Sequence, residues 1–296
     1  MATDYTCHYC KTTSIDPGRS CPACGGPVDV AAVITRGGWE ELPAIADMAH
    51  IQFGRSRVQI EGELVPVADF ALHDEEEIWF NHHVLLWKDP QVHLERMSMS
   101  GGVKRVFAGI PLILCRAKGP GHIALSFDHS GEIVAVPLQQ NQSIITLEHH
   151  FLGASATIVY DYQQSPVWFR TRNGDETETH YPMGRYIDEF TAKDGHGLLL
   201  LHAKGNVFRR ELAAGEEVLV KGAALLYVDG GMAFSLHLEG VVNRGARLFG
   251  PSFSRFAWVR LQGPGRIAIQ SVHGQHEVTS NNVVGSANGT TNRNWT

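Results

Sequence analysis

Hydrophobic and polar residues alternate along most of the chain, which is the pattern of half-buried β-strands. Residues 78–80 and 218–220 alternate in this way and are flanked by β-branched and aromatic residues. The apolar runs IPLILC (110–115) and GLLLL (197–201) have the length of buried strands. Helical periodicity is nearly absent, and a short helix is predicted only near residues 40–48.

Two sets of similar segments recur along the chain and indicate an internal repeat. The first set reads IWFNHHVLLWKDPQVHL (78–94), ITLEHHFLGASATIVYD (145–161) and VLVKGAALLYVDGGMAF (218–234), with shifts of 67 and 73 residues, 140 in total. The second set reads LILCRAKGPGHIAL (112–125), LLLLHAKGNVFRREL (198–212) and AWVRLQGPGRIAI (257–269). Aligned on Gly119, Gly205 and Gly263, these segments have shifts of 86 and 58 residues, 144 in total. Because both sets give nearly the same total, we predict three homologous units of about 70 residues.

Turn residues divide the predicted strands within each unit. Gly-Pro-Gly at 119–121 and 263–265 predicts a tight turn, because Pro restricts φ and Gly permits positive φ. The middle copy keeps Gly205 but has no proline. One unit alone would leave a sheet edge or an apolar face uncovered. We therefore predict an all-β fold, in which three pseudo-repeated β-sandwich-like units pack around a pseudo-threefold axis as one domain.

Composition divides the chain into four segments. Residues 1–30 are rich in cysteine, residues 31–50 form a linker, and residues 51–272 hold the repeated β domain. Residues 273–296 are rich in Asn, Thr, Ser and Gly and are predicted to be a flexible tail, because they cannot bury enough apolar surface to offset the entropy of ordering.

Charge and hydropathy narrow the partners and the compartment. The net charge of −6 gives no general attraction for phosphate backbones, so we do not expect nucleic-acid binding. No apolar stretch approaches the ~20 residues of a membrane-spanning helix, and the polar start of the chain lacks a secretory apolar region. We expect a cytoplasmic, reducing environment.

Four of the five cysteines form two Cys-x-x-Cys pairs, at Cys7, Cys10, Cys21 and Cys24. Each pair can turn both sulfurs toward one point, and four thiolates around a tetrahedral centre are typical of structural zinc. Two disulfides are the alternative, which a reducing compartment disfavours. A thioredoxin-like redox centre would need a βαβ context, which does not follow here. We therefore predict a zinc ribbon with a closed, structural Zn²⁺ site.

This leading segment resembles the short N-terminal zinc ribbons of bacterial proteins, through its four cysteines and its CPACGGP ending. Residues 1–30 carry two basic and three acidic side chains, whereas a duplex-binding ribbon should be basic. We expect the ribbon to contact a protein or simply to staple the N-terminus.

Three segments of the β domain resemble the mitochondrial-biogenesis family first named for altered inheritance of mitochondria, which has many bacterial members. They read GGVKRVFAGIPLILCRAKGPGHIALS (101–126), LHAKGNVFRRELAAGEEVLVKGAALLYVD (201–229) and RLFGPSFSRFAWVRLQGPGRIAIQS (247–271). The resemblance covers roughly residues 50–272. It implies a threefold-repeated β domain similar in fold to the tryptophan RNA-binding attenuation protein. For mitochondrial members it implies a role in inner-membrane organisation, and it supplies no catalytic residues.

The histidines are the main candidates for further chemistry. His82-His83 and His149-His150 fall at equivalent positions with an offset of 67 residues, while the third repeat has Gly222-Ala223 there. One ring of each pair could face a central axis and share a metal or ligand, but polar strand-end residues left by duplication explain the pairs more simply.

Other polar and reactive residues have simpler explanations. The acidic stretch 174–182 reads as a solvated loop rather than a cation site, and Cys115 reads as an inert core residue. A basic and aromatic edge could touch an anionic partner such as lipid headgroups, and it comprises Lys104, Arg105, Phe107, Arg244, Arg247 and Phe249.

Three functions remain open at this point. The first is a non-enzymatic binding or scaffolding protein that meets a protein partner, a membrane surface or its own copies. The second is an enzyme or small-ligand binder with a pocket on the pseudo-axis. The third is an RNA-binding regulator, which rests on fold analogy alone.

Overall fold

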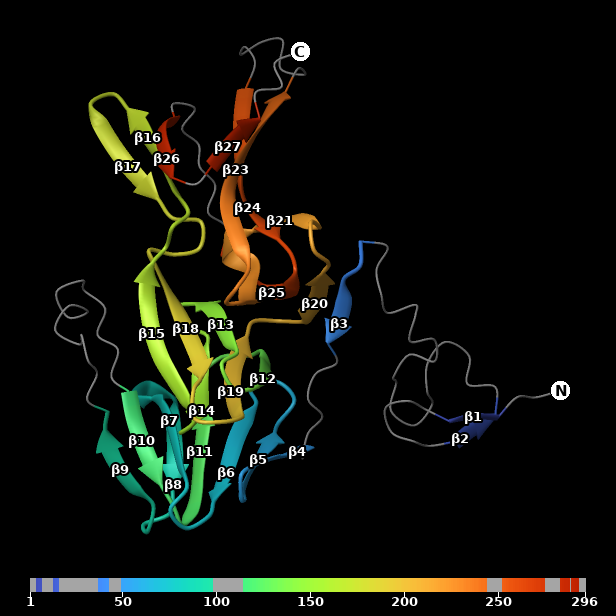
Figure 1. The fold of residues 1–296 in the computed structure, drawn as a ribbon, viewed down its shortest axis with the longest axis vertical. Helices are drawn as coiled ribbons and strands as arrows, with labels where there is room; N and C mark the ends of the chain where they lie inside the picture. Colours follow the sequence, from blue (N-terminus) through green and yellow to red (C-terminus); the bar gives the residue numbers. More distant parts are fainter. Residues whose placement is uncertain are drawn as a thin grey trace.

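The computed structural model describes residues 4–6, 13–15, 37–42, 49–97, 114–243, 252–274, 283–287 and 289–292. Within these ranges the regular structure consists of strands and two short 3₁₀ helices, η2 (His82–Val84) and η3 (Gly222–Ala224), so the predicted all-β fold is confirmed. Figure 1 shows an elongated arrangement, with β4 to β11 at the lower end and β16, β17, β23, β26 and β27 at the upper end.

The strands fall into three sets with the same order of pairing. The first repeat contains β6 (Val67–Leu72), β7 (Glu77–Asn81), β8 (Leu85–Lys88), β9 (His93–Arg96), β10 (Leu114–Lys118) and β11 (Gly121–Ser126). The second contains β12 (Glu132–Leu138), β13 (Ser143–Leu147), β14 (Phe151–Ser155), β15 (Ile158–Gln164), β18 (Tyr186–Ala192) and β19 (Gly197–Ala203). The third contains β20 (Val207–Leu212), β21 (Glu217–Lys221), β22 (Leu225–Asp229), β23 (Ala233–Asn243), β24 (Ser252–Gln262) and β25 (Gly265–Gln270).

The remaining described strands extend these sets. They are β1 (Asp4–Thr6), β2 (Thr13–Ile15), β3 (Glu40–Leu42), β4 (Ala49–Phe53), β5 (Ser56–Glu61), β16 (Trp168–Asn173), β17 (Glu176–His180), β26 (Val283–Ala287) and β27 (Gly289–Asn292). Strands β16 and β17 form a hairpin inserted between β15 and β18, and the described residues of the other two repeats contain no equivalent hairpin.

Each repeat splits its strands between two sheets, and neighbouring repeats share a sheet. The six-stranded sheet has the order β12-β19-β14-β7-β10-β9, so the second repeat joins the first where β14 pairs with β7. The seven-stranded sheet has the order β15-β18-β13-β22-β25-β20-β3, so the third repeat joins the second where β22 pairs with β13. The outer sheets have the orders β4-β5-β6-β11-β8 and β21-β24-β23-β27.

One turn hydrogen bond recurs in all three repeats. The amide of Glu76 donates to His73 O at 3.1 Å, that of Gln142 to Gln139 O at 2.9 Å, and that of Glu216 to Ala213 O at 3.0 Å. The same three turn residues accept, through their backbone carbonyls, from Gly119, Ala192 and Gly263. These contacts relate the repeats residue by residue.

The turn hydrogen bonds also correct the predicted alignment of the second repeat in the second set of similar segments. The turn at 119–120 corresponds to the β18–β19 turn after Ala192, whereas Gly205 lies in the connection between β19 and β20. The middle member of the second set of similar segments was therefore wrong. An arrangement closed about a threefold axis would also pair β8 with β21, and in the described part of the chain these strands lie in different sheets, so the axis stays a prediction.

The core follows the strand alternation predicted by the sequence. Residues 198–201 on β19 are buried on both faces of the six-stranded sheet, as the apolar run at 197–201 predicts. The indole of Trp79 packs against Phe151 and Phe190, and its Nε1 donates to Ile158 O at 2.9 Å. This bond ties the first repeat to the second.

Three segments differ from their sequence-based expectation. Residues 40–42, where a helix was predicted, form β3 on the edge of β20. The predicted linker 31–50 contributes β3 and the start of β4. The predicted tail 273–296 contributes β26, which pairs with β16, and β27, which pairs in parallel with β23. Open sheet edges explain these additions, because an edge offers unpaired backbone groups to any extended segment.

Candidate functional site

Two groups of predicted site residues lie outside the described residues. The four predicted zinc ligands Cys7, Cys10, Cys21 and Cys24 belong to the first group, and their zinc site stays a prediction. The basic and aromatic edge (Lys104, Arg105, Phe107, Arg244, Arg247 and Phe249) is the second group.

The paired histidines lie where the first and second repeats meet, but their predicted equivalence was wrong by one residue. The recurring turn relates Glu76 to Gln142, an offset of 66 rather than 67. His83 in η2 therefore corresponds to His149, which has a φ of 71°. His82, His83 and His149 are exposed, while His150 is buried.

Two other histidines join them in what we call the histidine cluster, comprising His83, His129, His150 and His202 with Phe127 at its centre. The ring of Phe127 lies 5.8 Å from that of His83, 5.4 Å from that of His129 and 4.8 Å from that of His202. The rings of His129 and His202 are 4.7 Å apart. His83 lies in η2, Phe127 and His129 follow β11, His150 directly precedes β14, and His202 lies on β19.

Hydrogen bonds define the ring state of His150. Its Nδ1 donates to the carbonyl oxygen of His202 at 2.8 Å, and its Nε2 accepts from the Gln270 amide at 3.4 Å. His150 thus links the second repeat to the end of β25 in the third. Within the described part of the chain, the Nε2 atoms of His129 and His202 are buried and have no hydrogen-bond partner.

Burial controls the charge of this cluster. It lowers the pKa of His150 to about 4, and it lowers the pKa of His202 to about 4 with a further contribution from neighbouring histidines. Both rings are therefore neutral at physiological pH. Among the described residues, no three His, Cys, Asp or Glu side chains lie close enough to hold a metal ion.

Sequence reasoning missed His129 and His202. They lie outside the paired motifs, so the repeat pattern did not mark them. A signal that could have found His202 is a lone histidine directly after the buried run 197–201.

Within the acidic stretch 174–182, which was expected to be a solvated loop, residues 176–180 form β17 and pair with β16. His180 stacks on Phe169 with ring centroids 4.9 Å apart, and its Nε2 is 2.7 Å from Thr171 Oγ1. Its position in the hairpin is therefore explained by packing and a hydrogen bond.

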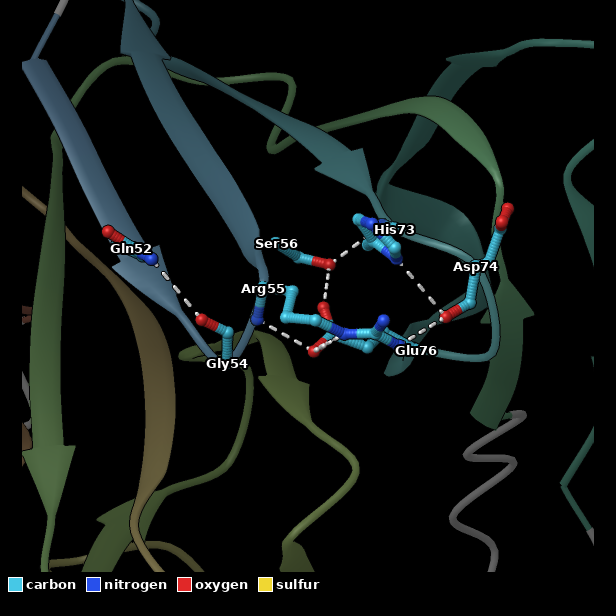
Figure 2. A network of polar contacts seen from close by, with 7 residues as sticks. All are labelled: Gln52, Gly54, Arg55, Ser56, His73, Asp74 and Glu76. Atoms are coloured by element: carbon cyan, nitrogen blue, oxygen red, sulfur yellow. Dashed lines mark hydrogen bonds and ion pairs between the residues drawn. The ribbon is translucent and has the colours of Figure 1, made fainter.

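A cavity of about 550 Å³ lies beside the β4–β5 turn, lined by Phe53, Glu76, Pro137, Ser155 and Leu198 among others. Figure 2 shows the Glu76 carboxylate held by Ser56 and Arg55 at one side of this turn. The Arg55 amide donates to Glu76 Oε1 at 2.7 Å, and the Ser56 hydroxyl accepts from His73 N at 2.9 Å.

Burial works to raise the pKa of Glu76, but the bonds from Ser56 and Arg55 hold it below its usual value. A paired, ionised carboxylate is a poor general base, because catalysis favours a pKa near the operating pH. Glu76 therefore ties the hairpin to the turn rather than offering proton transfer to the cavity.

The outer strands β8 and β21 expose apolar side chains. Each pairs with one strand within the described residues, β8 with β11 and β21 with β24. Leu86 and Trp87 on β8 are 58% and 44% exposed, and Leu219 on β21 is 39% exposed. Such open edges can accept a further strand through backbone hydrogen bonds.

Comparison with known proteins finds similarity both to a family model and to solved structures. The family model described as mitochondrial biogenesis AIM24 matches residues 58–272. The crystal structure of protein SPYM3_0169 from Streptococcus pyogenes has a TM-score of 0.54 and 18% identity to this chain, covering 74% of it and 94% of the other chain. A comparison with curated proteins found no match. At this identity the structural likeness shows the fold alone.

Proposed function

The chain belongs to the mitochondrial biogenesis AIM24 family, and from this premise we propose that it is a non-enzymatic β-scaffold that binds protein partners through its open sheet edges. The observation that carries the proposal is the exposure of Leu86, Trp87 and Leu219 on the two outer strands β8 and β21. Edge strands with exposed large apolar side chains are a liability unless something covers them.

The mode of binding follows from the backbone. A strand added to β8 or β21 would satisfy the unpaired N–H and C=O groups of that edge, while Leu86 or Leu219 would bury apolar area against it. Backbone hydrogen bonds would give this interaction its affinity, and the exposed side chains would give it selectivity, as expected for a scaffold protein. In the part of the chain that the structure describes, no helix has the length and hydropathy to cross a membrane.

Affinity capture with matched variants tests this function. Wild-type protein, the double variant Leu86→Lys/Leu219→Lys and the control Leu64→Lys serve as baits in native lysate. Leu64 is 78% exposed and lies in the loop between β5 and β6, so it matches the chemistry but not the position. We expect partners to be retained by wild type and the control and lost by the double variant. Partner sets that are identical for all three baits would overturn the proposal.

A ligand-binding role at the histidine cluster is the second candidate. The observation that favours it is the pair of buried, unpartnered Nε2 atoms on His129 and His202, noted above for the described residues. A bound metal beyond the one expected for the four cysteines, lost in His129→Gln and in His202→Gln, would support this role. A metal content unchanged by both substitutions would exclude it.

A further inference from the structure

We propose that the chain assembles head to tail with a second copy of itself, by pairing β8 of one copy with β21 of the next. The inference rests on the proposed scaffold function and names the partner for its two edges. It follows from the two joints that already connect the repeats inside one chain.

Both internal joints use the same strands in the same register. In the first joint Ala154 on β14 pairs with Trp79 on β7, and in the second Val228 on β22 pairs with Ile145 on β13. Trp79 and Ile145 each lie three residues after the recurring turn residue, Glu76 or Gln142, so they are equivalent.

The strands on the other side of each joint, β14 and β22, are equivalent because both carry the same irregularity in their pairing. Strand β14 skips one residue between Phe151 and Gly153 where it pairs with β19, and β22 skips one residue between Leu225 and Tyr227 where it pairs with β25. Strand β8 skips Leu86 in the same way against β11. The residue equivalent to Ala154 and Val228 is therefore Lys88 on β8.

The third copy of each joint strand lies at the edge of an outer sheet. Strand β8 is the counterpart of β14 and β22, and β21 is the counterpart of β7 and β13, with Leu219 three residues after Glu216. The described structure therefore has one half of the joint on each of two outer sheets, and the two halves are complementary.

The exposed fractions of Leu86 on β8 and Leu219 on β21 show that each outer strand lacks a partner strand that its counterparts have. Leu86 is 58% exposed, whereas its counterparts Leu152 and Leu226 are fully buried. Leu219 is 39% exposed, whereas its counterparts Trp79 and Ile145 are 2% and 4% exposed. The outer strands keep the apolar residues of a joint at positions where one chain alone leaves them in water.

Pairing of β8 with β21 between two copies agrees with the structure better than pairing of the two strands within one chain. Figure 1 places β8 at the lower end of the molecule and β21 in its upper part, so one chain could join them only by a large rearrangement. A joint between copies is head to tail, and such contacts build rings or open filaments. In the register of the internal joints, Lys88 of one copy lies opposite Leu219 of the next, and Trp87 lies opposite Val220.

Cysteine cross-linking tests this register. One preparation carries Lys88→Cys and another, with a different tag, carries Leu219→Cys. Directly opposed residues in an antiparallel pair have Cα atoms about 4.5–5.5 Å apart, within disulfide range. We expect mild oxidation of the mixture to yield a mixed disulfide dimer. Each variant oxidised alone measures the background from native cysteines.

The matched control is Glu217→Cys, mixed with Lys88→Cys. Glu217 is also exposed on β21 but lies two residues from the expected position, beyond the ~7 Å Cα separation that a disulfide spans. We expect at least about tenfold less mixed dimer from this pair. Equal yields from both pairs, or no yield from either, would overturn the proposed joint.

Two further measurements separate the alternatives. In the double variant Lys88→Cys/Leu219→Cys, a disulfide confined to one chain would show closure within the chain and overturn the inference. Sedimentation should show wild-type mass rising with concentration, Leu64→Lys behaving like wild type and Leu219→Lys remaining monomeric. Wild-type protein that is monomeric at all concentrations but loses other partners on Leu219→Lys would overturn self-assembly and leave the scaffold function standing.

Discussion

His150 and His202 lie in the contact between repeats, and burial keeps both rings neutral in the folded chain at neutral pH. Burial lowers the pKa of each ring in the folded chain to about 4, whereas an unfolded histidine has a pKa near 6.5. As pH falls from about 6.5 to about 4, the unfolded chain takes up protons that the folded chain refuses. Stability must therefore decrease over this range.

Substituting His202 by glutamine should weaken this acid sensitivity. One histidine contributes a slope of at most about 1.4 kcal/mol per pH unit to the free energy of unfolding, and His202→Gln removes it. Urea unfolding between pH 7.5 and pH 4.5 measures the slope. The exposed His82→Gln serves as the control and should retain the wild-type slope. A wild-type slope in His202→Gln would contradict the assigned neutrality of the ring.

Glu132 at the start of β12 should act in the opposite direction. Burial, together with the nearby Glu41, raises the pKa of Glu132 to about 7. Between pH 4.5 and pH 7 the folded chain holds a proton that the unfolded chain has released, so stability falls as pH rises through this range. We expect Glu132→Gln to melt at a higher temperature than wild type at pH 8 and at the same temperature at pH 4. Glu41→Gln should give a smaller gain, and calorimetry at both pH values distinguishes these outcomes.

At the scale of the strands, one side-chain anchor recurs beside each repeated hairpin. Asp89 accepts from the His122 amide at 2.8 Å, Ser155 from the Leu198 amide at 3.0 Å, and Asp229 from the Arg266 amide at 2.8 Å. The acceptor is the last residue of β14 or β22 or directly follows β8, and the donor is the second residue of the paired strand β19, β25 or β11. The contact is kept although the residue type changes.

Removing this anchor should destabilise the protein by an amount that depends on its charge. Asp229 also pairs with the Arg266 guanidinium at 2.9 Å, so Asp229→Ala leaves an amide and a cation without their acceptor and should cost about 2–3 kcal/mol. Ser155→Ala removes a neutral bond and should cost about 1 kcal/mol. Denaturant unfolding measures both, with the exposed Glu63→Ala as the control. Equal losses for the two sites would argue against the charge-assisted anchor.

The all-β strand pattern could be predicted, because alternation is a local property of the sequence. Three sets of strands share one order of pairing, as the predicted repeat requires, whereas the threefold axis stays a prediction. The β18–β19 hairpin of the second repeat could not be predicted from the sequence. Its connection has four residues, whereas the equivalent connections in the other two repeats have two. The glycine at 205 adopts a φ of 72° in a different turn, so a turn glycine alone did not identify the hairpin. The partners of β26 and β27 were also beyond local pattern, since edge addition depends on which sheet edge is open.

The histidine cluster was predictable in part. His82, His83, His149 and His150 stood out as pairs, but the structure buries only His150 and brings it close to His202, which is 52 residues further along the chain. Contact between β14 and β19 makes this neighbourhood, and no periodicity in the sequence reports it.

At the scale of the whole molecule, the repeats form a series in which every joint strand is buried except the first and the last. This explains how one chain can be stable and still retain two surfaces for assembly: the internal joints supply the core, and the outer strands keep the same apolar residues exposed. Because the repeats are alike, the outer strands have the same apolar positions as the internal joints and can pair in the same way with another strand.

The N-terminal cysteines add a prediction that is independent of assembly. Elemental analysis of the protein should give about one zinc per chain, because four thiolates at Cys7, Cys10, Cys21 and Cys24 would complete the predicted tetrahedral site. Cys21→Ser should lose most of that zinc. Cys115→Ser is the matched control, because burial on β10 raises the pKa of the Cys115 thiol and disfavours the thiolate that binds metal. Zinc that persists in Cys21→Ser or disappears in Cys115→Ser would place the metal elsewhere.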